Sequence, residues 1–176
     1  MQNANLIVMR HAEARPAAPG ESDFSRTLTA FGVRDAIRVG AWMREQLPAP
    51  KRVLASPAAR TRETVAAIFD PAPAQPPELR WDPRLYLADL PQLLDVLAEE
   101  PVSPLMLVGH NPGLEDLIVY LLGIDEPTAI DASMPTAGVF ALELPARRGP
   151  MLPGSAKLVV FSSPERLAAT GPSPSR

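Results

Sequence analysis

Residues 105–122 read LMLVGHNPGLEDLIVYLL, and the class of fold follows from this stretch. Its first four residues form a short apolar run, which is typical of a strand buried on both faces. A polar turn follows, in which Asn111 can cap a helix that has Pro112 at its first position. Beyond the turn, apolar residues recur at helical spacing, at Leu114, Leu117, Ile118, Leu121 and Leu122. A buried strand that leads directly into an amphipathic helix indicates an α/β protein.

The same alternation of strands and helices continues over most of the chain. Short apolar runs predict strands at Leu6–Met9, Arg52–Ala55, Leu79–Trp81, Leu105–Val108, Gly138–Leu144 and Ala156–Phe161. Helical patterns between them predict helices over 29–47, 56–69, 90–99 and 111–122. This order predicts a three-layer α/β sandwich, in which a mostly parallel central sheet carries helices on both faces.

Two further helix starts can be predicted from capping residues. Thr29 is expected to cap the first helix, and Ser56 the second, with Pro57 at the first helical position. The first helix is predicted to bury one face, made of Val33, Ala36, Ile37, Gly40, Ala41 and Leu47. We also expect Trp42 and Trp81 in the core.

The composition is that of a globular protein. Of 176 residues, 46% are hydrophobic and 21% are charged, and the length fits one domain with a substantial core. Prolines crowd residues 15–21, 69–78 and 170–176, which we predict to be loops and a frayed end. We therefore predict a single domain over residues 1–164 and a tail over 165–176 that is poorly ordered at its end.

Charge and cysteine content narrow the functional classes. The net charge of −3 disfavours a broad nucleic-acid-binding face, so that any anion site should be a local cluster of arginines. The absence of cysteine excludes disulfides and thiol catalysis, and agrees with a reducing cytoplasm. With no signal peptide and no apolar run near the roughly 18 residues of a membrane span, we expect a cytoplasmic monomer that contacts no membrane.

Rare polar residues follow three of the predicted strands. They are the pair Arg10-His11, the segment 56–60 that ends in Arg60, and the pair His110-Asn111; the chain contains no other histidines. In open α/β sheets, ligands bind beyond the carboxyl ends of the strands. Two of the three loops lead into helix N-termini, which favour an anion. We expect Arg60 in the first turn of its helix, at an exposed rim of this anion site.

Two imidazoles among arginines suit phosphoryl transfer. Guanidinium groups bind phosphoryl oxygens by charge-assisted hydrogen bonds, often in pairs. A neutral imidazole can attack phosphorus and form a phosphoenzyme, and nearby arginines lower its pKa and so keep it neutral. A second imidazole could donate a hydrogen bond to the transition state. Because arginines supply the positive charge, this chemistry requires no metal and no cofactor.

Five stretches together resemble the histidine phosphatase (phosphoglycerate-mutase-like) superfamily. They read VMRHAEA from Val8, SRTLTAFGVRDA from Ser25, VLASPAARTRETV from Val53, LMLVGHNPGLEDL from Leu105 and MPTAGVFALEL from Met134. In length and in this set the chain is most similar to small bacterial phosphohistidine phosphatases of the SixA type. Ala12 departs from the pattern, because glycine is usual there.

The resemblance implies a phosphoglycerate-mutase-like fold and a role for each matching residue. It makes His11 the phosphorylated nucleophile, Arg10 and Arg60 phosphate ligands, His110 the second histidine of the pocket, and Arg26 a further phosphate-binding arginine. Many larger relatives carry an acidic proton donor in a mid-chain insertion. Asp82 and Asp89 lie in the corresponding stretch here, but no motif selects either of them.

The missing acid bears on the substrate. An imidazole, with an unperturbed pKa of about 6.5, leaves far more easily than an alkoxide, so that phosphohistidine is favoured over an alkyl phosphate. The longest predicted loop, over 70–78, is stiffened by proline, and an open site without a lid would suit a side chain carried on a folded protein. We therefore expect a metal-independent phosphatase that acts on a phosphorylated protein.

Other readings remain open. A phosphomonoesterase of the same mechanism could act on a small phosphorylated metabolite, and a non-catalytic phosphate-binding domain is also conceivable, although every reactive position is intact. His11, Glu13 and His110 could suggest a metal site with two histidines and one carboxylate, but the adjacent arginines would repel a cation.

Overall fold

The structure, a computed structural model, describes residues 3–101, 103–123, 134–145 and 151–169. In this part of the chain six strands form one sheet, in the order β3-β2-β4-β1-β5-β6. Their bounds are β1 Leu6–Arg10, β2 Arg52–Ala55, β3 Glu78–Trp81, β4 Leu105–Gly109, β5 Val139–Glu143 and β6 Lys157–Ser162. β1 to β4 run parallel to one another, whereas β5 is antiparallel to both β1 and β6. The prediction of a mostly parallel sheet is confirmed.

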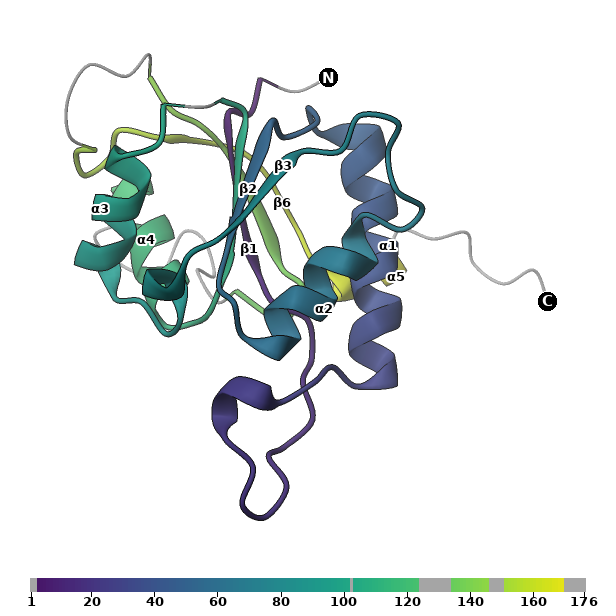
Figure 1. Ribbon diagram of the computed structural model, residues 1–176. Coiled ribbons are helices and arrows are strands. Elements are labelled where there is room, and N and C mark those ends of the chain that lie inside the picture. Colours follow the sequence, from purple (N-terminus) through teal and green to yellow (C-terminus); the bar gives the residue numbers. More distant parts are fainter. Residues whose placement is uncertain (1–2, 102, 124–133, 146–150, 170–176) are drawn as a thin grey trace.

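Helices cover both faces of this sheet. They are α1 Ala30–Gln46, α2 Ala59–Ile68, α3 Leu90–Ala98, α4 Gly113–Leu122 and α5 Pro164–Ala169, with short 3-10 turns η1 Asp23–Ser25 and η2 Pro83–Leu85. Figure 1 shows α1, α2 and α5 on one face and α3 and α4 on the other. This is the predicted three-layer sandwich, with the phosphoglycerate-mutase-like architecture.

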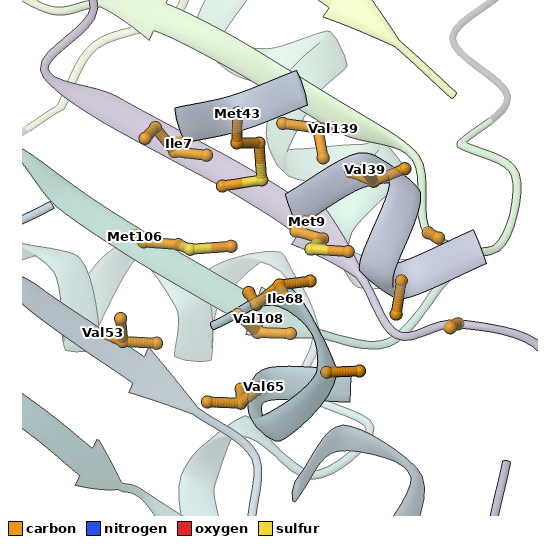
Figure 2. Packing of buried hydrophobic residues seen from close by; sticks show 14 of the residues in the cluster. Ile7, Met9, Val39, Met43, Val53, Val65, Ile68, Met106, Val108 and Val139 are labelled. Atoms are coloured by element: carbon orange, nitrogen blue, oxygen red, sulfur yellow. The ribbon is translucent and has the colours of Figure 1, made fainter. Parts of the chain in front are cut away.

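The apolar runs of β1, β2, β4 and β5 are buried on both faces, whereas β3 is mostly exposed and β6 is only partly buried. In β1, Ile7 and Met9 lie in the layer beneath α1 and α2, which Figure 2 shows, while Leu6 and Val8 lie in the layer beneath α3 and α4. Successive side chains of a strand point to opposite faces, so that a sheet covered on both sides requires continuous apolar strands. Because these strands are packed on both faces, the polar residues that directly follow them are held in fixed positions at one edge of the sheet.

One predicted helix start is confirmed and two are wrong. The hydroxyl oxygen of Thr29 accepts a hydrogen bond from the Gly32 amide at 2.9 Å, and so caps α1. Ser56 does not cap α2, which begins at Ala59 after Ala58. Asn111 does not cap α4, which begins at Gly113 after Pro112. Both polar side chains instead form long-range hydrogen bonds within the site described below.

The buried face of α1 agrees with the predicted one only in part. Ala36, Gly40 and Leu47 are buried as predicted, but Val33 and Ile37 are each 38% exposed, and Gly32, Val39 and Met43 take their place on the buried face. At Gly40 a β-carbon would lie 2.3 Å from the carbonyl oxygen of Ile68, so α1 crosses α2 at a point where only glycine fits. Val39 and Met43 of this helix belong to the core, in place of the predicted Val33 and Ile37. Trp42 and Trp81 are only partly buried, at the margin of the core.

The predicted boundary between domain and tail falls at the start of α5. Leu167 of this helix packs against the layer that includes α1, and residues 170–176 of the predicted tail lie outside the described residues. Among the described helices, none combines the length and the apolar character needed to cross a bilayer.

Candidate active site

The site lies at the carboxyl ends of β1, β2 and β4. Parallel pairing brings these ends to one edge, where His11 N donates to Gly109 O at 3.1 Å and Ser56 N donates to Val108 O at 3.1 Å. The rings of His11 and His110 come within 5.1 Å of each other, between centroids. They line a cleft of about 420 Å³ together with Arg10, Glu13, Ala14, Asp23, Arg26, Arg60, Leu87, Asn111 and Thr136. The structure thus brings all five predicted site residues together.

His11 presents an unprotonated ring nitrogen. Its Nδ1 lies 2.7 Å from the carbonyl oxygen of Ala12, and because a carbonyl can only accept, Nδ1 must carry the proton. Nε2 therefore keeps its lone pair, and it accepts a hydrogen bond from Nε of Arg60 at 3.2 Å. Burial lowers the pKa of His11 to about 4. The hydrogen bond to Ala12 raises this pKa, whereas the positive charges of Arg60, Arg10 and Arg26 lower it further. The ring is neutral near pH 7.

His110 has the opposite tautomer. Its Nδ1 lies 3.2 Å from Nη2 of Arg60, and since a guanidinium can only donate, this nitrogen accepts. Nε2 carries the proton and donates it to the hydroxyl oxygen of Ser56 at 2.8 Å. Burial lowers the pKa of His110 to about 3. Electrostatic repulsion of a protonated His110 by His11 and by Arg60 lowers this pKa further. Both imidazoles are therefore neutral, and both direct a lone pair at one guanidinium.

Arg60 is buried, which corrects the expectation of an exposed rim residue. It is the second residue of α2 and is only 2% exposed. Besides the two imidazoles it bonds Asp23, whose carbonyl oxygen accepts from Nη1 at 2.6 Å and whose carboxylate accepts from Nη2 at 3.0 Å. Asp23 belongs to η1, in the segment between β1 and α1 that Figure 1 shows extending beyond the carboxyl ends of the strands. This segment covers Arg60 from outside.

Arg10 provides a second guanidinium, one of whose donors has no partner in the described part of the chain. Its Nη1 donates to the carbonyl oxygen of Met134 at 2.8 Å. Nε is buried without a hydrogen-bond partner among the described residues. A buried donor that is left unpaired is unfavourable, and an oxygen of a bound anion would satisfy it. Burial lowers the pKa of Arg10, while the carboxylate of Glu115 raises it.

Asn111 is held in place by the same group of residues. Its side-chain amide donates to Glu115 Oε1 at 2.7 Å and to the carbonyl oxygen of Met134 at 3.0 Å. Glu115 also accepts from the Met134 amide at 2.8 Å. The carboxylate in the first turn of α4 thus fixes the segment that holds Arg10, and this use of Asn111 explains why it does not cap the helix.

Arg26, which directly follows η1 in the segment between β1 and α1, lines the cleft. Its Nε donates to the carbonyl oxygen of Arg15 at 2.7 Å, and its Nη1 lies 2.8 Å from the carboxylate of Asp23. The loose match in sequence has therefore selected an arginine that lines the site, although its guanidinium is paired with a carboxylate here.

Two residues of the site were missed at the sequence level. Asp23 binds Arg26 and Arg60, and its carboxylate also accepts from the hydroxyl of Tyr86 at 2.8 Å. The bonds from Arg26 and Tyr86, and then the charge of Arg60, hold the pKa of Asp23 far below its usual range. The ring of Tyr86 meets that of His110 edge-on at 5.5 Å. Neither residue follows a predicted strand, so strand ends alone could not reveal them.

Neither candidate acid lines the cleft. The carboxylate of Asp82 pairs with Arg84 at 2.7 Å, and hydrogen bonds from that arginine lower its pKa. The side chain of Asp89 caps α3 by accepting from the Gln92 amide at 3.0 Å. Both carboxylates therefore have structural partners.

The suggested metal ligand is bonded elsewhere. Glu13 lines the cleft, but its Oε1 accepts a hydrogen bond from the hydroxyl of Thr29 at 2.7 Å. Within the described ranges, no three histidine or carboxylate side chains are grouped as a metal ion would require.

Ala12 fits where glycine is usual in the resembled family. The residue is fully buried, and its amide donates to the hydroxyl of Thr64 at 3.0 Å. Thr64 in turn donates to the carbonyl oxygen of Arg60 at 2.7 Å. The loop that carries His11 is thereby tied to the first turns of α2, and the methyl group does not obstruct it.

The fold and the site define an α/β protein with two neutral imidazoles and several arginines around one cleft. No protein-family model matches the chain. It is 35% identical over 164 residues to an uncharacterized protein of Mycobacterium tuberculosis, a match that covers 89% of this chain and 99% of that one. It is 31% identical over 134 residues to the phosphohistidine phosphatase SixA homolog of Haemophilus influenzae, covering 70% of this chain and 80% of the relative.

A solved structure agrees with these relatives. The structure of a protein from Agrobacterium tumefaciens assigned as the phosphohistidine phosphatase SixA superposes with a TM-score of 0.79 at 28% identity, covering 93% of this chain and 99% of that one. The chain belongs to the SixA-type phosphatases of the histidine phosphatase superfamily.

Proposed function

We propose that this phosphatase removes the phosphoryl group from phosphohistidine on a protein, without a metal ion, through a phosphoenzyme formed on His11. The unprotonated Nε2 of His11, whose lone pair accepts from Nε of Arg60, supports the proposal most directly. The hydrogen bond from Nδ1 to the Ala12 carbonyl oxygen fixes the ring. The ring is neutral near pH 7 because the pKa of His11 is lowered to about 4, and His11 lines the cleft together with the arginines.

In the first step, Nε2 of His11 attacks phosphorus. A new P–N bond forms and the P–N bond to the substrate histidine breaks. The substrate imidazole takes the electron pair and leaves as a neutral ring, because its other ring nitrogen already carries a proton from solvent. The guanidiniums of Arg10 and Arg60, with Arg26 if it exchanges Asp23 for substrate, neutralise the phosphoryl oxygens. Arg60 must turn its Nε–H from His11 to the phosphoryl group as the nucleophile becomes engaged.

In the second step, a water molecule attacks the phosphoenzyme. The P–N bond breaks, His11 regains its lone pair on Nε2, and inorganic phosphate leaves as H2PO4⁻ with both protons of the water. The proton stays on Nδ1 throughout, donated to the Ala12 carbonyl oxygen, and this keeps Nε2 as the reacting atom.

His110 has to change protonation in order to assist. Its Nδ1 carries the lone pair that accepts from Nη2 of Arg60, and a lone pair repels a phosphoryl oxygen. A bound dianion raises the pKa of a neighbouring imidazole, because opposite charge favours the protonated form. His110 then becomes a donor to the phosphoryl group while Ser56 continues to accept from Nε2.

The leaving group favours phosphohistidine over an alkyl ester. Asp82 and Asp89 are both bonded to other partners and neither lines the cleft. Imidazole leaves without a strong acid, whereas an alkoxide does not. We expect a phosphohistidine protein to be hydrolysed at least about tenfold more efficiently than an alkyl phosphate, a barrier difference of about 1.4 kcal/mol.

A panel assay tests this proposal. Rates of phosphate release should be compared for a phosphohistidine-bearing protein, a phosphohistidine peptide, p-nitrophenyl phosphate and several sugar phosphates, each with and without EDTA. A clear preference for a sugar phosphate would favour the small-molecule phosphomonoesterase and contradict the protein substrate. No turnover of any phosphorylated compound would leave only a phosphate-binding role.

A further inference from the structure

Three apolar and aromatic side chains form a rim at the mouth of the cleft, here called the apolar rim: Phe24, Tyr86 and Leu87. Leu87 lines the cleft and is 55% exposed. Phe24 follows Asp23 in η1 and is 40% exposed. Its ring meets that of Tyr86 edge-on at 5.0 Å, so two segments far apart in the sequence form one surface beside the phosphate-binding arginines.

Folding alone does not explain leucine at position 87. The residue has a φ of +52°, in the left-handed region that disfavours leucine and is better suited to glycine or asparagine. Its side chain is exposed, so it gains little from burial in the core. Strained backbone that persists in a folded protein is concentrated at functional sites. An exposed leucine with a strained backbone at the entrance of a polar cleft therefore indicates a residue that contacts a ligand.

The surrounding packing fixes this leucine in place. Its neighbour Ala88 is buried, and the Ala88 carbonyl oxygen approaches Gly113 so closely that a β-carbon there would lie 1.9 Å away. Since Gly113 begins α4 directly after the loop of His110, the segment that carries Leu87 is packed against the loop that carries a site histidine. The position of the apolar rim relative to the cleft is thus set by backbone contact.

We propose that the apolar rim determines substrate specificity by contacting apolar side chains that flank the phosphohistidine of a folded protein. This inference rests on the proposed function. A phosphoryl group bound by Arg10 and Arg60 necessarily leaves the remainder of its carrier at the mouth of the cleft, over Leu87. The body of a sugar phosphate is polar and gains nothing from an apolar rim, whereas apolar residues of a protein surface lose their contact with water there.

The exchange Leu87→Asn provides a clean test. Asparagine has nearly the size of leucine, tolerates the left-handed backbone and removes the apolar contact. Leu152→Asn is the matched control, because Leu152 is 60% exposed and belongs to a loop whose Gly154 amide bonds Tyr120 near the far end of α4. Each variant should be assayed with a phosphohistidine-bearing protein and with phosphoramidate, which has the P–N bond but no organic body.

For Leu87→Asn we expect kcat/KM for the phosphoprotein to fall about fivefold to tenfold, through a higher KM at unchanged kcat, because the lost contact contributes equally to ground state and transition state. The rate with phosphoramidate should stay unchanged, as should both rates for Leu152→Asn. An equal loss with both substrates, or no loss with the phosphoprotein, would overturn the role of the rim. If Leu87→Asn cleaves the phosphoprotein as fast as wild type does, the rim proposal fails alone and the proposed function stands. If the wild-type protein cleaves phosphoramidate but not the phosphoprotein, the protein substrate of the proposed function fails together with the rim. If it cleaves neither, the proposed function fails as a whole.

Discussion

Replacing Arg60 by alanine should abolish most of the activity while leaving the fold intact. The guanidinium makes four hydrogen bonds: to His11 Nε2, to His110 Nδ1, and to the carbonyl and carboxylate oxygens of Asp23. It is also a full positive charge in a buried position beside the phosphoryl site. Removing one preorganised charge of this kind costs about 3 kcal/mol of transition-state stabilisation, which is a loss of about a hundredfold in kcat/KM.

The effect on stability should be smaller. Asp23 keeps its bonds to Arg26 and Tyr86, and half of its surface remains in water, so that the substitution leaves no stranded buried charge. We expect a decrease of about 1–2 kcal/mol in the free energy of unfolding, from lost hydrogen bonds and a small cavity. Denaturant titration at pH 7 would measure this decrease, and steady-state phosphate release would measure kcat/KM.

Arg62→Ala is the matched control for Arg60→Ala. This arginine lies two residues further along α2, is exposed, and stacks on the ring of Trp81 with 4.3 Å from guanidinium carbon to ring centroid. Its removal should leave kcat/KM within about twofold of wild type, because it is outside the cleft. If Arg60→Ala were stable and retained more than about a third of the wild-type kcat/KM, the placement of its charge at the reacting phosphoryl group would be refuted.

Three further results are expected. Because the pKa of His11 is lowered to about 4, kcat/KM should stay level as the pH falls from 7 to about 5 and drop below about 4, whereas loss of activity near pH 6.5 would show an unperturbed nucleophile. Extensive chelation should leave the rate unchanged, and restoration of lost activity by a divalent ion would revive the metal site at Glu13. Asp23→Asn should reduce kcat by about tenfold, since the charge that orients Arg60 is lost, and an unchanged kcat would show that the Asp23 carbonyl suffices.

The pH profile must be measured on folded protein. Unfolded histidines take up protons near pH 6.5, but His11 and His110, with lowered pKa values, do not until about pH 4 and 3. The unfolded state therefore binds more protons in this window, and stability falls as the pH is lowered through it. Circular dichroism at each pH would separate loss of folding from protonation of the nucleophile.

The layers of the fold could be predicted from the sequence because strands buried on both faces produce continuous apolar runs. The predictions of helix caps failed where a polar side chain can bond either the amides of the next helix or another group that the folded chain brings near. Ser56 and Asn111 are good capping residues, yet Ser56 bonds His110 and Asn111 bonds Glu115, because the folded chain offers them partners far along the sequence or in the next turn. A local capping rule cannot weigh such contacts.

The residues alone made the site predictable where it coincides with strand ends. Arg26, which lines the cleft away from a strand end, was predicted only through the family resemblance, and Asp23 and Tyr86 were not predicted. Arg10, His11 and His110 follow apolar runs directly, so topology alone brings them together. The burial of Arg60 depends on Asp23, which lies 37 residues away, and Tyr86 joins the same carboxylate from 63 residues away. No periodic pattern marks either contact, and they become evident only when η1 is seen to cover the cleft.

Trapping the phosphoenzyme is the most direct test of the histidine nucleophile. Protein mixed with a phosphohistidine substrate carrying labelled phosphorus should be quenched in alkaline detergent within one turnover. We predict label that is stable in base and labile in acid, located by peptide mapping on His11, and absent from the His11→Ala variant. Label on His110, label that survives acid, or turnover by His11→Ala at the wild-type rate would contradict the proposed mechanism.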